Sequence, residues 1–333
     1  MQLSELESIT LTKFNIKWGK PVLNVTNNSI KCMRSVAVLD LFLCLICSFQ
    51  DFVSSIKTGA HIGYFINLIT DREGNILPVL ESMPALLFLL VNTGELYVIL
   101  KIFDKTPRQF YNRVLFILIL ISLVLIVLVI MIMIIILVEV YRPHPDMHEG
   151  LKQGMLSYSN NSLIKTTIDT LQIEFQCCGN KKYDEWYSIN WSDKNYLSKG
   201  FEDSSNGNTP FSCCSMNSLF PCIHHDIENT GTTYLYVPER NLSISTTGCY
   251  DSLLKTKVKY GWQIIGNLFL LMFLELLAII LLRFIQTAHF SSNFNFTKEK
   301  ILYTMWLIGR YRGKIMVPEN APEPPQVPQD LMS

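Results

Sequence analysis

An uninterrupted apolar run at residues 114–138 limits what this 333-residue chain can fold into. The run is 25 residues long, carries no charge and has Ser122 as its only polar side chain. A helix of this length crosses the ~30 Å hydrocarbon core of a bilayer. Weaker apolar stretches at residues 35–56, 83–100 and 260–282 repeat the pattern, so we predict four transmembrane helices.

Lys and Arg residues are unevenly distributed among the segments that connect these spans. Five lie in the N-terminal arm (1–34), four in the loop 101–113 and six in the tail (283–333), against two in the loop 57–82. Positive residues in short loops collect on the cytosolic side of a membrane. We therefore predict cytosolic termini, a small extracellular loop at 57–82 and a large extracellular or lumenal loop at 139–259.

The balance of charge and the absence of catalytic motifs exclude several function classes. The chain has 28 basic and 28 acidic residues, so its net charge does not attract nucleic acid. It contains no nucleophile elbow, no zinc-protease motif and no glycine-rich phosphate loop. We expect no enzyme activity, no cofactor, no bound metal and no nucleic-acid partner.

Six of the nine cysteines lie in the large loop, and two of them are adjacent. An even number of cysteines in a polar loop between spans indicates disulfides in an oxidising compartment. Six cysteines allow 15 pairings, and composition does not choose among them. Gly179, directly after the adjacent pair, permits a sharp turn of the backbone. The six are Cys177, Cys178, Cys213, Cys214, Cys222 and Cys249.

Two motifs in this loop resemble the large extracellular loop of tetraspanins. They are the Cys-Cys-Gly at 177–179, within the run 165–180, and the Pro-Phe-Ser-Cys-Cys at 210–214. The flanking residues, Trp186 and Trp191 included, resemble the peripherin and rod-outer-segment-membrane-protein branch of that family. The resemblance implies an all-α membrane protein with four transmembrane helices and a disulfide-knotted, mostly helical large extracellular loop. It also implies the pairs Cys177–Cys249, Cys178–Cys213 and Cys214–Cys222.

The same resemblance implies a function. A tetraspanin of this branch is expected to be a membrane scaffold that organises membrane proteins and shapes membrane curvature through oligomerisation of its loops. Its partners would be the membrane, further copies of itself or another tetraspanin, and other membrane proteins, in the plasma membrane or an internal membrane derived from it. One alternative is an escort for a receptor, integrin or protease. A second is a proton or ion transporter that uses Asp40, Glu95 and Glu275.

One position departs from the branch. Proteins of the peripherin branch are similar in having a seventh loop cysteine, which is unpaired within the chain and links dimers into larger oligomers. At the corresponding position this chain has Ser162. We therefore expect non-covalent assembly. Aromatic residues are enriched in protein–protein interfaces. We predict that four aromatic residues of the large loop form such an interface: Tyr183, Trp186, Trp191 and Phe211.

Several residues are candidates for modification. Asn160, Asn190 and Asn241 begin Asn-x-Ser/Thr glycosylation signals in the large loop. Cys32 lies beside the first span, where cysteines are often palmitoylated.

Polar residues within the spans form two predicted groups. Asp40, Cys44, Cys47 and Asp51 share one face of the first span, because their spacing follows the helical period. Asn92, Glu95 and Glu275 are predicted to lie at similar depth in the second and fourth spans. We interpret both groups as polar contacts between helices. Metal ligation at the first group and an ion path through the second are the alternatives.

Two further segments carry expectations. Four residues just beyond the third span are expected to be solvated, with metal binding as the alternative: His144, Asp146, His148 and Glu149. In the tail, apolar residues between 301 and 308 with basic neighbours predict a short interfacial helix. The proline-rich end that follows predicts an extended, disordered segment.

Overall fold

The structure is a computed structural model that describes residues 22–70, 73–102, 108–191, 207–219, 221–225, 227, 243–292 and 302–307. The chain divides into two compact units, which we describe separately. The loop-side unit comprises Phe42–Thr93 and Ile121–Glu275. The terminal unit comprises Met1–Leu41, Gly94–Leu120 and Leu276–Ser333.

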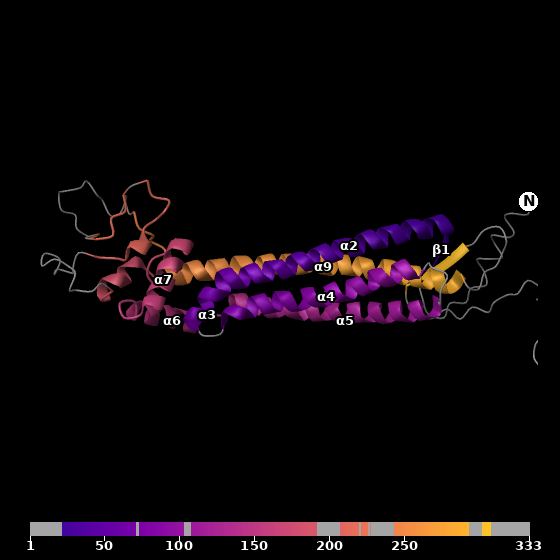
Figure 1. The fold of residues 1–333 in the computed structure, drawn as a ribbon, viewed down its shortest axis with the longest axis horizontal. Coiled ribbons are helices and arrows are strands. Elements are labelled where there is room, and N and C mark those ends of the chain that lie inside the picture. The colour runs from indigo at the N-terminus through magenta and orange to yellow at the C-terminus, as the bar shows by residue number, and fades with distance from the viewer. Residues whose placement is uncertain are drawn as a thin grey trace, which may run out of the picture. The chain divides into compact units, whose positions relative to one another are not determined.

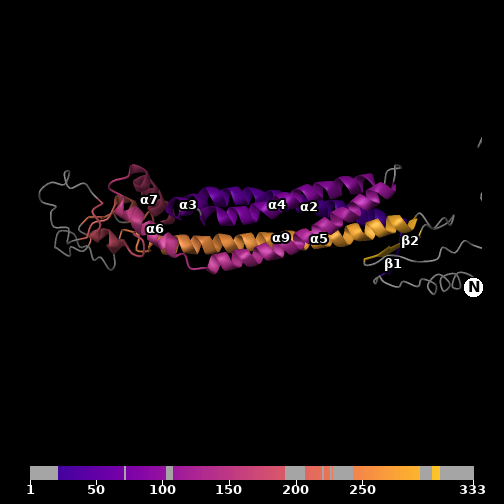
Figure 2. The same ribbon diagram turned by 90° about the horizontal axis from the view of Figure 1, so that it is seen from below.

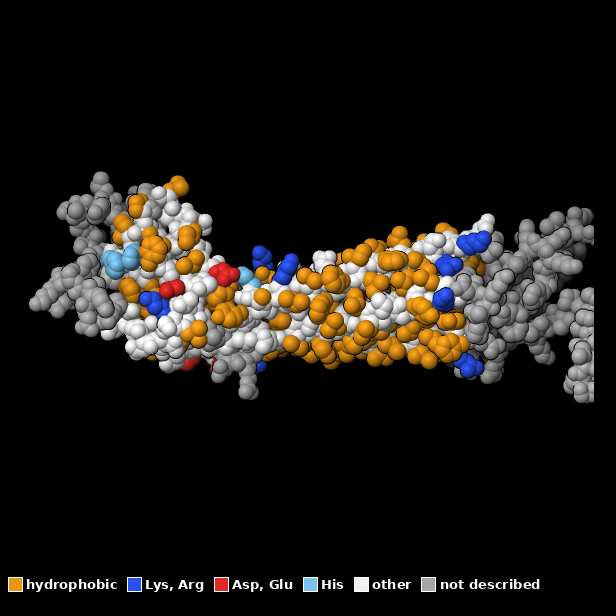
Figure 3. All heavy atoms as spheres, viewed as in Figure 1, with side chains coloured by type: hydrophobic (Ala, Val, Ile, Leu, Met, Phe, Trp, Pro, Cys, Tyr) orange, Lys and Arg blue, Asp and Glu red, His pale blue; other side chains and the backbone are white. Residues whose placement is uncertain are grey.

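Four long helices each contribute a segment to both units: α2 (Asn27–Thr58), α4 (Ile76–Lys101), α5 (Arg108–Tyr141) and α9 (Cys249–Ser292). All four contain stretches long and apolar enough to cross a membrane, as the sequence predicts. Within the loop-side unit their segments run side by side (Figures 1 and 2). Hydrophobic side chains cover the visible face of the helical segments, and Lys and Arg side chains gather where these segments end (Figure 3). Lipid is the medium that suits such a surface.

The helices extend beyond the predicted spans. The fourth span was predicted to begin at residue 260, whereas α9 begins at Cys249. The segment 57–82, predicted to be a polar loop, is largely helical. It holds the end of α2, a π-helical turn (Gly59–Gly63), α3 (Tyr64–Thr70), a 3₁₀ turn (Glu73–Asn75) and the start of α4. Hydropathy marks only the part of a helix that lies in lipid, so it did not reveal the helical structure within this segment.

The large loop adds two helices to the loop-side unit: α6 (Pro145–Leu156) and α7 (Ser162–Phe175). Pro145 lies in the first turn of α6. Backbone N–H groups in that turn have no acceptor within the helix, so proline, which lacks an N–H, is tolerated there. The Asn161 side chain caps α7 by accepting hydrogen bonds from the N–H groups of Leu163 and Ile164. Two 3₁₀ turns, Tyr183–Ser188 and Phe211–Cys213, follow in the chain.

Two apolar clusters fill the interior of the loop-side unit. The first joins α3, α6, α7 and the start of α9, and its members are Ile62, Phe65, Ile66, Met147, Leu151, Leu171, Cys177, Cys249 and Leu253. The second lies around Trp186 and includes Met155, Tyr158, Ile168, Cys178, Cys213, Ile227 and Ile244. Each cluster contains a disulfide, so covalent links and apolar burial stabilise the same parts of the loop.

In the terminal unit, two segments from opposite ends of the chain form an antiparallel pair. Strand β1 (Val22–Thr26) pairs with β2 (Leu302–Trp306), with Val22 opposite Trp306. Met305 is buried against Ile30 and Ala288. The predicted interfacial helix at 301–308 was therefore wrong over β2. The Tyr, Thr and Trp residues of β2 favour a strand, and β1 supplies the hydrogen-bonding partners that a local reading cannot reveal.

Candidate interaction surface of the large loop

Three disulfides fix the chain path of the large loop. They join Cys177 to Cys249, Cys178 to Cys213 and Cys214 to Cys222, with Cα–Cα distances of 4.9, 4.9 and 5.7 Å. These are the pairs that the family resemblance implies. Adjacent cysteines 177 and 178 point to different partners, so the first bond holds the end of α7 to α9 and the second holds it to the turn that carries Phe211.

The turn after the paired cysteines depends on glycine. Gly179 has a φ of +71°, and a Cβ there would collide with the carbonyl oxygen of Lys182. One oxygen of Glu185 then accepts hydrogen bonds from the backbone N–H groups of Asn180 and Lys181, at 2.7 and 2.9 Å. This clamp turns the chain so that Trp186 points into the loop.

Trp186 is completely buried, so the prediction that it lies at an interface was wrong. Its indole N–H donates to Gln172 at 3.0 Å, in the amide orientation that also lets Gln172 donate to Ser212. Ser212 donates in turn to Asp169 at 2.6 Å. Trp186 is therefore part of the core of the large loop and not of its exposed surface.

Tyr158 completes this polar chain, because its hydroxyl donates to the same Asp169 oxygen at 2.6 Å. Burial, and then the neighbouring carboxylate of Asp169, raise the pKa of Tyr158. The phenol therefore stays protonated and remains a donor. Residues from α6–α7, the Cys178–Cys213 region and the Trp186 turn are connected by one hydrogen-bonded path.

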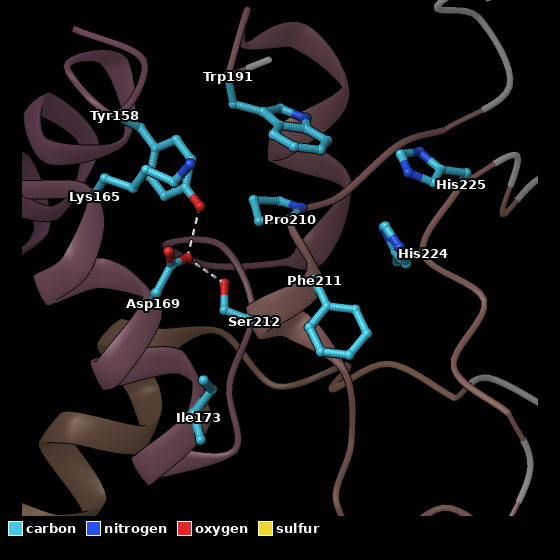
Figure 4. A pocket seen from close by; sticks show the side chains of 10 residues that line it. All are labelled: Tyr158, Lys165, Asp169, Ile173, Trp191, Pro210, Phe211, Ser212, His224 and His225. Atoms are coloured by element: carbon cyan, nitrogen blue, oxygen red, sulfur yellow. Dashed lines mark hydrogen bonds between the residues drawn. The ribbon is translucent and has the colours of Figure 1, made fainter. Parts of the chain in front are cut away.

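A shallow pocket of about 430 Å³ opens on this framework (Figure 4). Figure 4 shows Lys165, Asp169 and Ile173 along α7, with Phe211 and His224 across from them. Phe211 is 67% exposed, although Tyr183 and Trp191 are half-buried against the core. Of the four aromatic residues predicted to form an interface, Phe211 is the one that presents a broadly exposed ring.

A buried charged cluster lies where α5, α6 and α9 meet. The Lys257 ammonium group is 2.9 Å from a Glu139 carboxylate oxygen and 2.7 Å from Nε2 of His144. An ammonium group can only donate hydrogen bonds, so Nε2 of His144 is the acceptor of the hydrogen bond from Lys257. His144 is 3% exposed, so the prediction that it is solvated was wrong. The residues around it gave no sign of the distant Lys257.

The polar residues within the spans are buried. Asp40, Cys44 and Asp51 lie on the buried face of α2, and Cys47 is half-buried. Asn92 on α4 donates to a Glu275 oxygen on α9 at 2.5 Å. Glu95 is also buried on α4.

Sequence reasoning missed one further buried acid, Glu81. It was assigned to the loop 57–82, whereas α4 already includes it and leaves it fully buried. Glu81 faces Ser54 and Asp51 of α2. A sequence signal for this burial was available, because Glu81 is at helical spacing from the apolar residues that follow it in the chain.

The candidate modification residues are accessible where the structure describes them. Asn160 and Asn190 are exposed on the loop, and Cys32 is exposed on α2. Asn241 lies outside the described residues. Across those residues, no three His, Cys, Asp or Glu side chains are grouped as metal ligands would be.

Four membrane-crossing helices, with a disulfide-bonded loop between the last two, define a class of multi-pass membrane proteins. The tetraspanin family model matches residues 78–287, which is more than half of the chain. The chain therefore belongs to the tetraspanin family. This family consists of structural membrane proteins and not of enzymes.

Three relatives are similar over part of the chain. Peripherin-2 of Xenopus laevis is 34% identical over 156 residues, which cover 41% of this chain and 45% of the relative. Peripherin-2 of Felis catus is 36% identical over 161 residues, which cover 42% and 46%. Photoreceptor outer segment membrane glycoprotein 2 of Gallus gallus is 33% identical over 160 residues, which cover 43% and 44%. The chain thus spans a little under half the length of the curated relatives it matches.

Proposed function

We propose that this protein is a membrane scaffold that organises membrane proteins, and can curve the membrane, through assembly of its large loops. The observation that carries the proposal is the exposed apolar surface around Phe211, held on a disulfide-bonded framework above four membrane helices. Contiguous exposed apolar surface on a rigid support is typical of a site that binds another protein. The similarity to peripherin-2 supports the same function.

The framework supports this function because it loses little freedom on binding. The turn that carries Phe211 is tied to α7 by the Cys178–Cys213 disulfide and by the Ser212–Asp169 hydrogen bond. A preorganised surface keeps more of its interaction energy as affinity than a surface that must be ordered on contact.

The proposal includes an orientation in the membrane. All six cysteines of the large loop are paired, whereas Cys32 near the N-terminal end of α2 is free. Disulfides persist in oxidising compartments and are rare in the cytosol. Together with the Lys and Arg distribution, this supports an extracellular or lumenal loop and cytosolic termini, in the plasma membrane or an internal membrane derived from it.

Assembly is proposed to be non-covalent, because each loop cysteine already has a partner within the chain and Ser162 is exposed at the start of α7. The test is the size of the purified full-length chain in mild detergent. We expect a dimer or larger species that runs as a monomer on a non-reducing denaturing gel. A monomer in mild detergent, with no change in the shape of liposomes that contain the protein, would contradict the scaffold proposal. Cross-linking that captures a receptor or protease instead of a tetraspanin would favour the escort alternative.

The buried carboxyl groups are proposed to join helices and not to conduct ions. The hydrogen bond from Asn92 to Glu275 links α4 to α9, as expected for a structural contact within a membrane. Proton flux into liposomes that contain the wild-type chain tests this assignment. We expect no flux above that of empty liposomes. A flux that Glu275→Gln abolishes would favour a transporter.

A further inference from the structure

The exposed face of α7 carries a row of apolar groups outside the membrane. Leu163 is 61% exposed and Ile173 is 41% exposed, and they stand near the two ends of the helix. Thr166 and Thr170 lie between them and are also exposed. The four side chains share one side of α7, because residues three and four apart lie on the same helical face. We call this row, Leu163, Thr166, Thr170 and Ile173, the α7 stripe.

The two threonines of the α7 stripe present apolar surface. The Thr166 hydroxyl donates to the Ser162 carbonyl oxygen at 2.9 Å, and the Thr170 hydroxyl donates to the Thr166 carbonyl oxygen at 2.7 Å. Both donors are therefore used within the helix, which leaves the methyl groups to face outward. Because threonine side chains are small, a second helix can approach this face closely.

The spacing of the residues in the α7 stripe is the same whether it is followed from Leu163 to Ile173 or from Ile173 to Leu163. Its members are separated by three, four and three residues. Two such helices running in opposite directions would place Leu163 of each against Ile173 of the other, and Thr166 against Thr170. Phe211, exposed beside Ile173 in the same pocket, would then cover the arriving Leu163 (Figure 4).

The charges beside the α7 stripe fit the same arrangement. Lys165 and Asp169 lie one turn apart on one flank of the stripe. In an antiparallel pair, the same flanks of the two helices meet, so each Lys165 approaches the other copy's Asp169. Lys165 is exposed and its ammonium group lies over the Tyr158 ring, at 5.5 Å from the centroid. Asp169 is held in position by Tyr158 and Ser212.

We propose that α7 is the contact between two copies of this chain, with the two α7 helices packed in opposite directions through the α7 stripe. The proposal rests on the proposed function, because it names the surface and the partner through which the scaffold assembles. Apolar complementarity at the centre and two reciprocal charge pairs at the flank select a second copy over an unrelated protein.

Disulfide cross-linking of the full-length chain in mild detergent tests the geometry. In Thr166→Cys/Thr170→Cys, each new thiol faces the other thiol of the second copy, so mild oxidation should give a reducible dimer. Lys152→Cys on α6 is the matched control, because Lys152 is also exposed but lies off the stripe. It should remain a monomer on a non-reducing gel. Thr170→Cys alone should cross-link poorly, since the two copies of residue 170 would be offset by about 6 Å along the helices.

Charge reversal tests the flank. Lys165→Glu would place like charges together at both reciprocal pairs and should weaken the dimer about tenfold, whereas Lys152→Glu on α6 should not change it. Dilution in mild detergent followed by sizing gives the dissociation constant of each variant. Intact mapping of the three native disulfides shows that each variant is folded.

The outcomes separate this inference from the scaffold proposal. A wild-type dimer that Lys165→Glu leaves unchanged, with no bridge in Thr166→Cys/Thr170→Cys, would overturn the α7 contact and leave scaffolding intact. Efficient cross-linking by Thr170→Cys alone would overturn the opposite directions. A wild-type chain that is monomeric throughout would contradict both proposals.

Discussion

The loop-side unit and the terminal unit hold distant parts of the chain together by different bonds. In the loop-side unit, the Cys177–Cys249 disulfide joins residues 72 positions apart. In the terminal unit, β1 and β2 join the two ends of the chain through backbone hydrogen bonds and the burial of Met305. The exposed Cys32 is free. This difference is the one expected when the loop faces an oxidising compartment and the termini face the reducing cytosol.

The comparison also concerns how each contact fails. A disulfide restricts the conformations that the unfolded chain can adopt, so its loss lowers the free energy of unfolding of the whole loop. A pair of five-residue strands is stabilised by its own backbone hydrogen bonds and can open without unfolding the rest of the chain. The expected effects of substitutions therefore range from destabilisation of the whole loop to local opening of the strand pair.

The largest effect is expected for Cys177→Ser combined with Cys249→Ser. Opening a ring of 72 residues should lower the free energy of unfolding by about 4 kcal/mol. Denaturant unfolding of the purified chain in detergent measures the change. Cys32→Ser is the control and should leave the midpoint unchanged, because Cys32 forms no disulfide. Equal midpoints for the double variant and the wild type would show that packing alone holds α7 to α9.

The next effect concerns the charged cluster beneath the loop. Lys257→Met leaves the Glu139 carboxylate buried without its cation, which should cost about 3 kcal/mol. Adding Glu139→Gln should recover most of this loss, because the buried charge is then removed. Lys255→Met, at an exposed position two residues earlier on α9, is the matched control. A double variant as unstable as Lys257→Met would show that Lys257 acts through packing and not through its charge.

A smaller and local effect is expected in the terminal unit. Met305→Ala removes a buried side chain between β2 and the helices and should cost about 2 kcal/mol. If β1 and β2 open as a unit, hydrogen exchange of the β1 amides should accelerate roughly 30-fold, with no change in the loop. Met216→Ala is the control, because Met216 is 67% exposed. Acceleration in the loop as well would mean that the two units do not open independently.

The same comparison explains what the sequence could predict. The four spans follow from local hydropathy, and the pairing of the loop cysteines follows from the family resemblance carried by residues 177–179 and 210–214. The β1–β2 pair was missed because its strands lie almost the whole chain apart, and no local pattern near Met305 indicates Val25. The burial of Trp186 and His144 was missed for a related reason. Each depends on a partner brought from elsewhere, Gln172 in one case and Lys257 in the other.

The smallest effect is expected at the start of α7. Asn161→Ala removes the side chain that caps two N–H groups, at 3.0 and 3.3 Å, and should cost about 1 kcal/mol. Asn161→Asp retains an acceptor at the same place and should restore most of this loss, and neither change disrupts the glycosylation signal at Asn160. The disulfides hold the other end of α7, so the first turn alone should fray. Hydrogen exchange at residues 163–166 measures the fraying, and cross-linking of Thr166→Cys/Thr170→Cys in the Asn161→Ala background measures its consequence. If α7 forms the contact between copies, the fraying should reduce cross-linking; undiminished cross-linking would show that Leu163 and Thr166 contribute little to that contact.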